Sequence, residues 1–126
     1  MTNFEKVEQF MRTFGQKVNT TPDFPANTIV ELRDKLICEE KKEFDRAVFD
    51  RSIVDIADAL TDLLYVIYGA GHAYGINLDA CFAEVHRSNM SKLGTNDEPI
   101  YREDGKVLKG PGFFLPDFAK VLYGSK

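Results

Sequence analysis

Carboxylates recur at helical spacing in the middle of the sequence, inside stripes that should be apolar. A helix turns by about 100° per residue, so on the predicted helix that carries them Glu40 and Glu43 fall within the same apolar stripe as Leu36. The lysines and aspartates of this helix occupy its other side, which is typical of a solvated face. The register therefore opposes the simpler interpretation of the Glu39-Glu40-Lys-Lys-Glu43 run as a charged surface helix.

The next predicted helix repeats this anomaly. Asp55, Asp58 and Asp62 lie within about 60° of one another on a helical wheel. The same face continues into Val66 and Gly69, whereas a solvent face would stay polar. Asp62 is the only formal charge between residues 59 and 76, so we expect this helix to be buried nearly all round. In the alternative interpretation, Asp55 and Asp58 belong to an exposed first half of the helix.

Buried carboxylates on facing helices need raised pKa values, basic partners or a cation. Arg33, near the edge of the stripe, could neutralise only one of them. A set of oxygen ligands without histidine or cysteine indicates a hard cation, Mg²⁺ or Mn²⁺. Four or five carboxylates could hold two such ions, an arrangement suited to displacement at phosphorus.

Four helices of bundle length must position these side chains. We expect the first to follow the apolar stripe from Phe4 to Val18, and the second to be capped by Asn27 or Thr28 and to run to about Phe49. The third begins after Ser52 as N-cap and ends at Tyr74 before Gly75, and the fourth is capped by Asn77 and runs to about Lys92. His72, inside the third helix, is interpreted as a hydrogen-bonded core residue rather than a ligand.

The remaining sequence has a different pattern, with a hairpin signal at Asp104-Gly105, an aromatic loop and one last short helix after Pro116. The predicted fold class is all-α: a four-helix bundle with a short C-terminal hairpin and loop tail. We expect one domain over residues 1–126, with the helical core at about 1–94 and the tail at about 95–126.

Composition excludes several classes of function. The net charge of −4 argues against a nucleic-acid binder, which needs a basic face. The N-terminus is not a secretory signal, and the longest uncharged run is too short for a membrane span. Cys38 and Cys81 are far apart and are interpreted as reduced core residues, which favours a cytoplasmic location.

These residues resemble a known superfamily, the all-α nucleoside-triphosphate pyrophosphohydrolases, which includes MazG-like proteins and phosphoribosyl-ATP pyrophosphohydrolase. Glu39-Glu40-x-x-Glu43 matches the first half of the family signature. In the second half, Glu-x-x-Asp, Asp62 matches the aspartate but Ala59 stands at the glutamate. Asp58 is then the substitute on the same face, while Asp55-x-x-Asp58 is a rival alignment. VHRSNMSKLG and GKVLKGPGFFLPDF look like the phosphoribosyl-ATP pyrophosphohydrolase-like branch.

The resemblance implies that the chain hydrolyses a nucleoside triphosphate between the α and β phosphates, giving a monophosphate and pyrophosphate. It implies a Mg²⁺ site, with Mn²⁺ as a substitute, and a catalytic trio of glutamates. The implied metal ligands are Glu40, Glu43, Asp58 and Asp62; the implied catalytic residues are Glu39, Glu40 and Glu43; and the implied nucleotide contacts are Asn89, Lys92 and Lys109. Asn89 and Lys92 could equally form a polar helix end.

Further expectations concern specificity and partners. We expect aromatic and amide groups near the end of the first helix, such as Phe14, Gln16 or Asn19, to contact the base. A short bundle of this kind is expected to form a homodimer or a dimer of dimers. One alternative is a non-catalytic helical homodimer that serves as an interaction module. A carboxylate-bridged di-metal bundle is a weaker alternative, because no histidine follows a glutamate by three residues.

Overall fold

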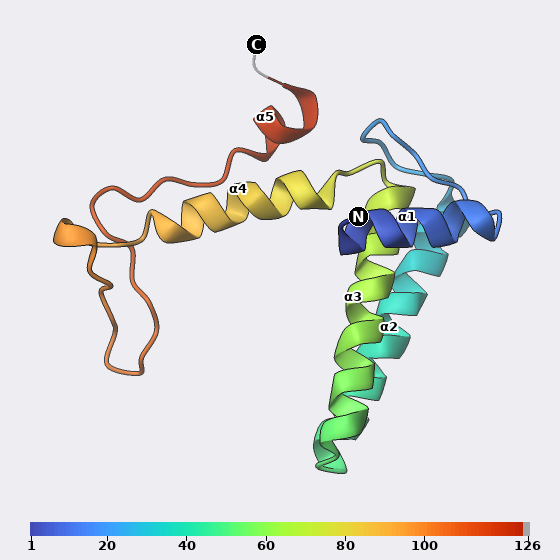
Figure 1. The fold of residues 1–126 in the computed structure, drawn as a ribbon, viewed down its shortest axis with the longest axis horizontal. Helices are drawn as coiled ribbons and strands as arrows, with labels where there is room; N and C mark the ends of the chain where they lie inside the picture. Colours follow the sequence, from blue (N-terminus) through green and yellow to red (C-terminus); the bar gives the residue numbers. More distant parts are fainter. Residues whose placement is uncertain (125–126) are drawn as a thin grey trace. The chain divides into compact units, whose positions relative to one another are not determined.

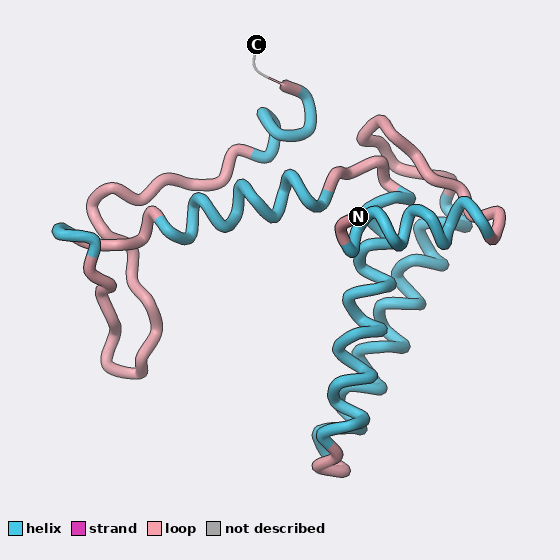
Figure 2. The backbone as a smooth tube through the Cα atoms, in the orientation of Figure 1, coloured by secondary structure: helices cyan, strands magenta, loops and turns pink. Residues whose placement is uncertain are grey.

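Helices dominate the part of the chain that a computed structural model describes, residues 1–124 (Figure 1; Figure 2). They are α1 (Asn3–Thr13), α2 (Asn27–Phe49), α3 (Ile53–Ala73), α4 (Leu78–Met90), a 3-10 turn η1 (Thr95–Asp97) and α5 (Phe118–Tyr123). No strand forms within residues 1–124, so the all-α prediction is confirmed. The chain forms two compact units, Met1–Leu78 and Asp79–Lys126.

The first helix is shorter than its apolar spacing predicts. Thr2 and Glu5 form a reciprocal capping box at its start, which satisfies backbone donors that a helix end leaves free. Phe4, Val7 and Met11 are buried as expected. The helix ends at Thr13, because Gly15 adopts a positive φ of 76° and a right-handed helix cannot continue through that conformation. Phe14 and Val18 therefore lie in the following loop, and the prediction of one helix to residue 18 is wrong.

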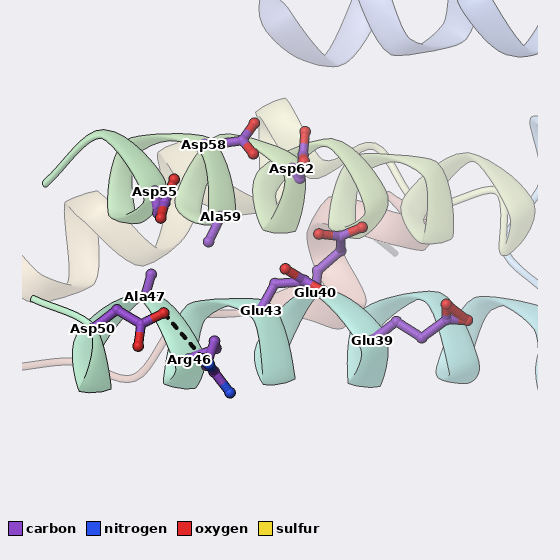
Figure 3. A pocket seen from close by; sticks show the side chains of 10 residues that line it. All are labelled: Glu39, Glu40, Glu43, Arg46, Ala47, Asp50, Asp55, Asp58, Ala59 and Asp62. Atoms are coloured by element: carbon purple, nitrogen blue, oxygen red, sulfur yellow. Dashed lines mark hydrogen bonds and ion pairs between the residues drawn. The ribbon is translucent and has the colours of Figure 1, made fainter. Parts of the chain in front are cut away.

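The α2–α3 hairpin carries the acidic residues. The two helices lie side by side in Figure 1 and make the most extensive helix–helix contact among the described residues. Ser52 caps α3 by accepting a hydrogen bond from the backbone of Asp55, as the sequence predicts. The predicted cap of α2 at Asn27 or Thr28 is wrong, because Ala26 is the N-cap and no side chain within residues 1–124 bonds to the start of this helix. Ala47 and Ala59 are almost fully buried and face one another between the helices (Figure 3). Their small side chains let the helices approach closely.

The C-terminus of α3 anchors the loop that precedes α2. Asn19 donates its backbone N–H to the carbonyl of His72 (2.9 Å) and its side-chain amide to that of Ala73 (2.6 Å). Asp23 N–H donates to the carbonyl of Tyr74 (3.0 Å). His72 is buried, and its Nε2 bonds to the carbonyl of Phe4 (2.7 Å), so its predicted structural role is confirmed. The carbonyl can only accept, so this nitrogen carries the proton.

Two burial predictions are wrong. One side of α3 is exposed, because Leu60, Leu64 and Tyr65 keep 40–52% of their surface accessible, and we expected the helix to be buried nearly all round. Its apolar character identifies a surface without a partner in a single chain rather than a core. Cys38 is also exposed, whereas Cys81 is buried as predicted.

The second unit combines α4 with the tail. Ser88, 2% exposed, donates its hydroxyl to the carbonyl of Phe114 (2.8 Å), and Glu84 accepts from the backbone of Asp117 (2.7 Å). The predicted hairpin is present as one antiparallel bridge between Tyr101 and Val107, with Gly105 at a positive φ of 88° in its turn. These contacts hold the aromatic loop and α5 against α4.

Candidate active site

An acidic cavity of about 370 Å³ lies along the α2–α3 hairpin (Figure 3). Glu40 and Glu43 point from α2 toward α3 in this view, and Asp58 and Asp62 stand on the facing helix. Ala47 and Ala59 fill the contact between the helices. The cavity is lined by Glu39, Glu40, Glu43, Arg46, Ala47, Asp50, Asp55, Asp58, Ala59 and Asp62.

The helical repeat brings these carboxylates together. On α2, Glu39, Glu40 and Glu43 are spaced so that they share one side, and on α3 Asp55, Asp58 and Asp62 do the same at intervals of three and four. The structure thus gathers every predicted metal ligand and catalytic glutamate at one place. Asp55, from the rival alignment, lies in the same cavity.

Negative charge in this cavity is concentrated and largely uncompensated. Arg46 is the only basic residue in the lining, and its Nε is already paired with Asp50 (3.0 Å). No ion pair among residues 1–124 involves the predicted ligands. Asp50 and Arg46 are the lining residues that sequence reasoning missed; Asp50 follows Glu43 by seven residues, so the stripe continued by two turns would have found it.

Glu40 is affected most by this crowding. Partial burial raises the pKa of its carboxyl, and the nearby charges of Asp62, Glu43, Asp58 and Glu39 raise it further. Each of these effects disfavours the ionised form. A crowd of like charges is the electrostatic situation that a bound cation would relieve.

Most of these carboxylates are more exposed than predicted. Glu40 is half-buried, but Glu39, Glu43, Asp58 and Asp62 are exposed. Across residues 1–124, no three acidic, histidine or cysteine side chains stand close enough together to hold a metal ion. The donor set is nevertheless that of a hard cation, because its ligand atoms are carboxylate oxygens and the one base in the lining, Arg46, is paired with Asp50. Exposed side chains are free to change rotamer and converge on an ion.

Sequence comparison decides the family. The family described as phosphoribosyl-ATP pyrophosphohydrolase matches residues 7–89, more than half of the chain, including both acidic helices. The chain belongs to the phosphoribosyl-ATP pyrophosphohydrolase family. The recognition made from the acidic motif and the tail is thereby confirmed.

Two relatives of this family member are informative. A crystal structure described as a "putative NTP pyrophosphohydrolase" from Exiguobacterium sp. 255-15 is 28% identical, with a TM-score of 0.50 over 91% of this chain and 89% of that one. "Uncharacterized protein L479" of Acanthamoeba polyphaga mimivirus is 45% identical over 112 residues. That match covers 86% of this chain and 42% of the relative, so the chain spans less than half the length of this curated protein. Family and fold are those of pyrophosphohydrolases, which are hydrolases.

The family motif has one departure in its second half. Ala59, at the position of the family glutamate, is only 4% exposed and packs against Ala47. A carboxylate at this position would have to leave the contact between the helices. Asp58 and Asp62 stand beside it on the cavity lining, so the replacement predicted from the sequence is geometrically available.

The predicted nucleotide contacts lie in the second unit. Asn89 and Lys92 line a cavity of about 310 Å³ together with Met90, Leu93, Pro99 and Val107. Lys109 instead places its Nζ over the ring of Phe113, 5.0 Å from the centroid. The structure therefore brings Asn89 and Lys92 together but does not place Lys109 in their cavity. No helix among residues 1–124 is long and apolar enough to cross a membrane.

Proposed function

We propose that the protein hydrolyses a nucleoside triphosphate between its α and β phosphates and releases a monophosphate and pyrophosphate. The observation that carries this proposal is the acidic cavity. Its lining gathers five carboxylates of the family motif region, and its one basic residue, Arg46, is already paired with Asp50. A triphosphate is itself strongly anionic, so this cavity would repel it without cations. The proposal therefore includes Mg²⁺, or Mn²⁺ in its place.

In the proposed site, Glu40, Glu43, Asp58 and Asp62 would hold the metal. When bound, the metal would neutralise the triphosphate and polarise the attacked phosphorus. Glu39 and Glu43 are exposed at the cavity wall, where a carboxylate can orient water and accept its proton. Within the second unit, Asn89 and Lys92 are the proposed nucleotide contacts, since their amide and ammonium groups are suited to phosphate and ribose oxygens.

The direct test is a pyrophosphate-release assay with the eight common nucleoside triphosphates and Mg²⁺. Glu43→Gln should lower turnover about 100-fold or more, since it removes a charged ligand and a candidate proton acceptor. Asp45→Asn is the matched control, because Asp45 lies on the same helix, pairs with Lys41 and is outside the cavity. Equal turnover of both variants would contradict the assignment, and a folded wild-type protein that turns over no nucleotide would contradict the function.

The exposed side of α3 supports a second proposal, that two copies of the chain associate through it as a dimer or as part of a dimer of dimers. Leu60, Leu64 and Ile67 are 38–52% exposed and follow one another at spacings of three and four. Leu64→Lys should place a charge in this contact and shift the protein toward the monomer in sedimentation velocity. An unchanged sedimentation coefficient would contradict the interface.

A further inference from the structure

Arg33 is a buried cation that forms no ion pair with an acidic residue within residues 1–124. It is 7% exposed, and burial lowers its pKa. Its guanidinium lies directly against Gly69 on α3, where an added Cβ would collide with Nη1. Its Nε is buried with no hydrogen-bond partner among residues 1–124. A buried charge with an unsatisfied hydrogen-bond donor contributes little to stability, so its presence calls for a functional explanation.

A hydrogen bond from the Arg33 guanidinium fixes the orientation of an amide. Nη2 of Arg33 donates to Oε1 of Gln16 at 3.2 Å. A guanidinium has donors only, so the amide must turn its oxygen toward Arg33 and its NH₂ group away from it. Gln16 itself is exposed, and its backbone is tied to the carbonyl of Met11 (2.8 Å). The side chain is therefore held as a hydrogen-bond donor toward its surroundings.

The neighbourhood of Gln16 is suited to a flat aromatic ligand. Phe14, two residues earlier, is 67% exposed, and its ring lies 4.5 Å from that of Phe10. Phe10 and Phe14 are both exposed and lie on the segment that leads to Gln16. Exposed aromatic rings and an oriented amide are the two kinds of group that recognise a nucleobase, by stacking on its face and by hydrogen bonding to its edge. Asn19, the other amide expected here, already commits its NH₂ group to Ala73.

This place lies along the same helices as the acidic cavity. Arg33 precedes Glu40 by seven residues and Gly69 follows Asp62 by seven, so the guanidinium is about 10 Å along the hairpin from the carboxylates. That separation is of the order of the distance between the phosphates and the base of one nucleotide.

We propose that Gln16 selects the nucleobase by donating to a carbonyl oxygen, and that Arg33 is the positioning residue that keeps its amide in the donor orientation. The inference rests on the proposed function. It assigns a preference for a base with a carbonyl, such as uracil, over one with an amino group at that edge, such as cytosine. An amino group there would meet the NH₂ group of Gln16, donor against donor.

The test is calorimetric binding of UMP and CMP, candidate products that differ at this edge. The wild-type protein should prefer UMP about 5-fold or more, the equivalent of one neutral hydrogen bond. Gln16→Glu replaces the donor by an acceptor and should abolish or reverse the preference. The same variant should melt at a higher temperature, because its carboxylate gives Arg33 a charged partner. If Gln16 had only a structural role, Gln16→Glu would raise the melting temperature without changing the preference for UMP over CMP.

Two further variants complete the test. Gln9→Glu, on the exposed part of α1, makes the same chemical change and should leave the preference intact. Arg33→Met keeps the volume but frees the amide to rotate, so the preference should fall toward unity. The role of Gln16 in base selection is overturned, and the proposed function stands, if the wild-type protein hydrolyses nucleotides without discriminating UMP from CMP. The same holds if Gln16→Glu keeps the wild-type ratio of the two affinities. If the folded protein neither binds nor hydrolyses nucleotides, the proposed function is overturned and this inference with it.

Discussion

Gly75 should be the glycine whose replacement by alanine destabilises the protein most, and Gly15 provides its matched control. Both have positive φ, 69° and 76°, so an alanine at either position costs about 1 kcal/mol in backbone conformation. They differ in surroundings. A Cβ at Gly15 meets nothing within 4 Å, whereas at Gly75 it would overlap the backbone oxygen of Thr21. Backbone cannot rotate away as a side chain can.

The expected loss follows from the contacts that hold this loop. Relieving the clash separates residues 19–23 from α3, and three hydrogen bonds span that junction, two from Asn19 and one from Asp23. At about 1 kcal/mol each, they add about 3 kcal/mol to the backbone cost. Gly75→Ala should then lose about 4 kcal/mol and Gly15→Ala about 1 kcal/mol. For a chain of this length, 1 kcal/mol is about 4 °C in melting temperature.

The assay is urea unfolding followed by circular dichroism, with calorimetric melting as a second measure. Melting temperatures should fall by about 15 °C for Gly75→Ala and about 4 °C for Gly15→Ala. If the two variants lose the same stability, the close approach of Thr21 to Gly75 has no energetic consequence. The account of how α3 anchors the loop would then be refuted.

Three other substitutions test separate contacts. Glu40→Gln should stabilise the metal-free protein at neutral pH, because folding raises the pKa of Glu40 and its ionised form therefore destabilises the folded state above the ordinary carboxyl pKa. The gain in melting temperature should vanish in acid, where the carboxyl is protonated in both states. A gain that does not change with pH would contradict this explanation. Gly69→Ala gains about 1 kcal/mol of helix propensity, but its Cβ crowds the Arg33 guanidinium. Urea unfolding should therefore show a net loss of stability of at most about 1 kcal/mol, and the preference for UMP over CMP should fall. An unchanged preference would contradict the contact between Gly69 and Arg33. Ser88→Ala should lose about 1 kcal/mol and speed proteolysis near Phe114, and unchanged proteolysis would argue against this tether.

Periodic signals are the part of this structure that the sequence predicts well. The acidic stripes of α2 and α3 are visible because three- and four-residue spacing survives any tertiary arrangement. The cap at Ser52 and the stop at Gly75 are visible because each has its own local chemistry. These features depend on neighbours within a few residues, and the candidate site is built almost entirely from them.

Features that depend on distant contacts are not predictable in this way. Apolar residues continue past Gly15 at helical spacing, so the spacing misplaces the end of α1 although the glycine marks it. Leu60 and Leu64 have the pattern of a core, and sequence alone does not distinguish a core from a surface that meets another molecule. The helical wheel places Arg33 at the edge of the stripe, but its orientation depends on Gln16, seventeen residues earlier.

The contact between Ala47 and Ala59 has a consequence for ion selection. Helix axes lie about 8–10 Å apart depending on the side chains between them, and two methyl groups give the narrow end of that range. In the proposed site, these two alanines would therefore set the spacing between the carboxylates of α2 and those of α3, although their methyl groups offer no ligand atom. Valine at either position would move the two helices apart, and the proposed site would then favour a cation of larger radius, such as Ca²⁺, over Mg²⁺.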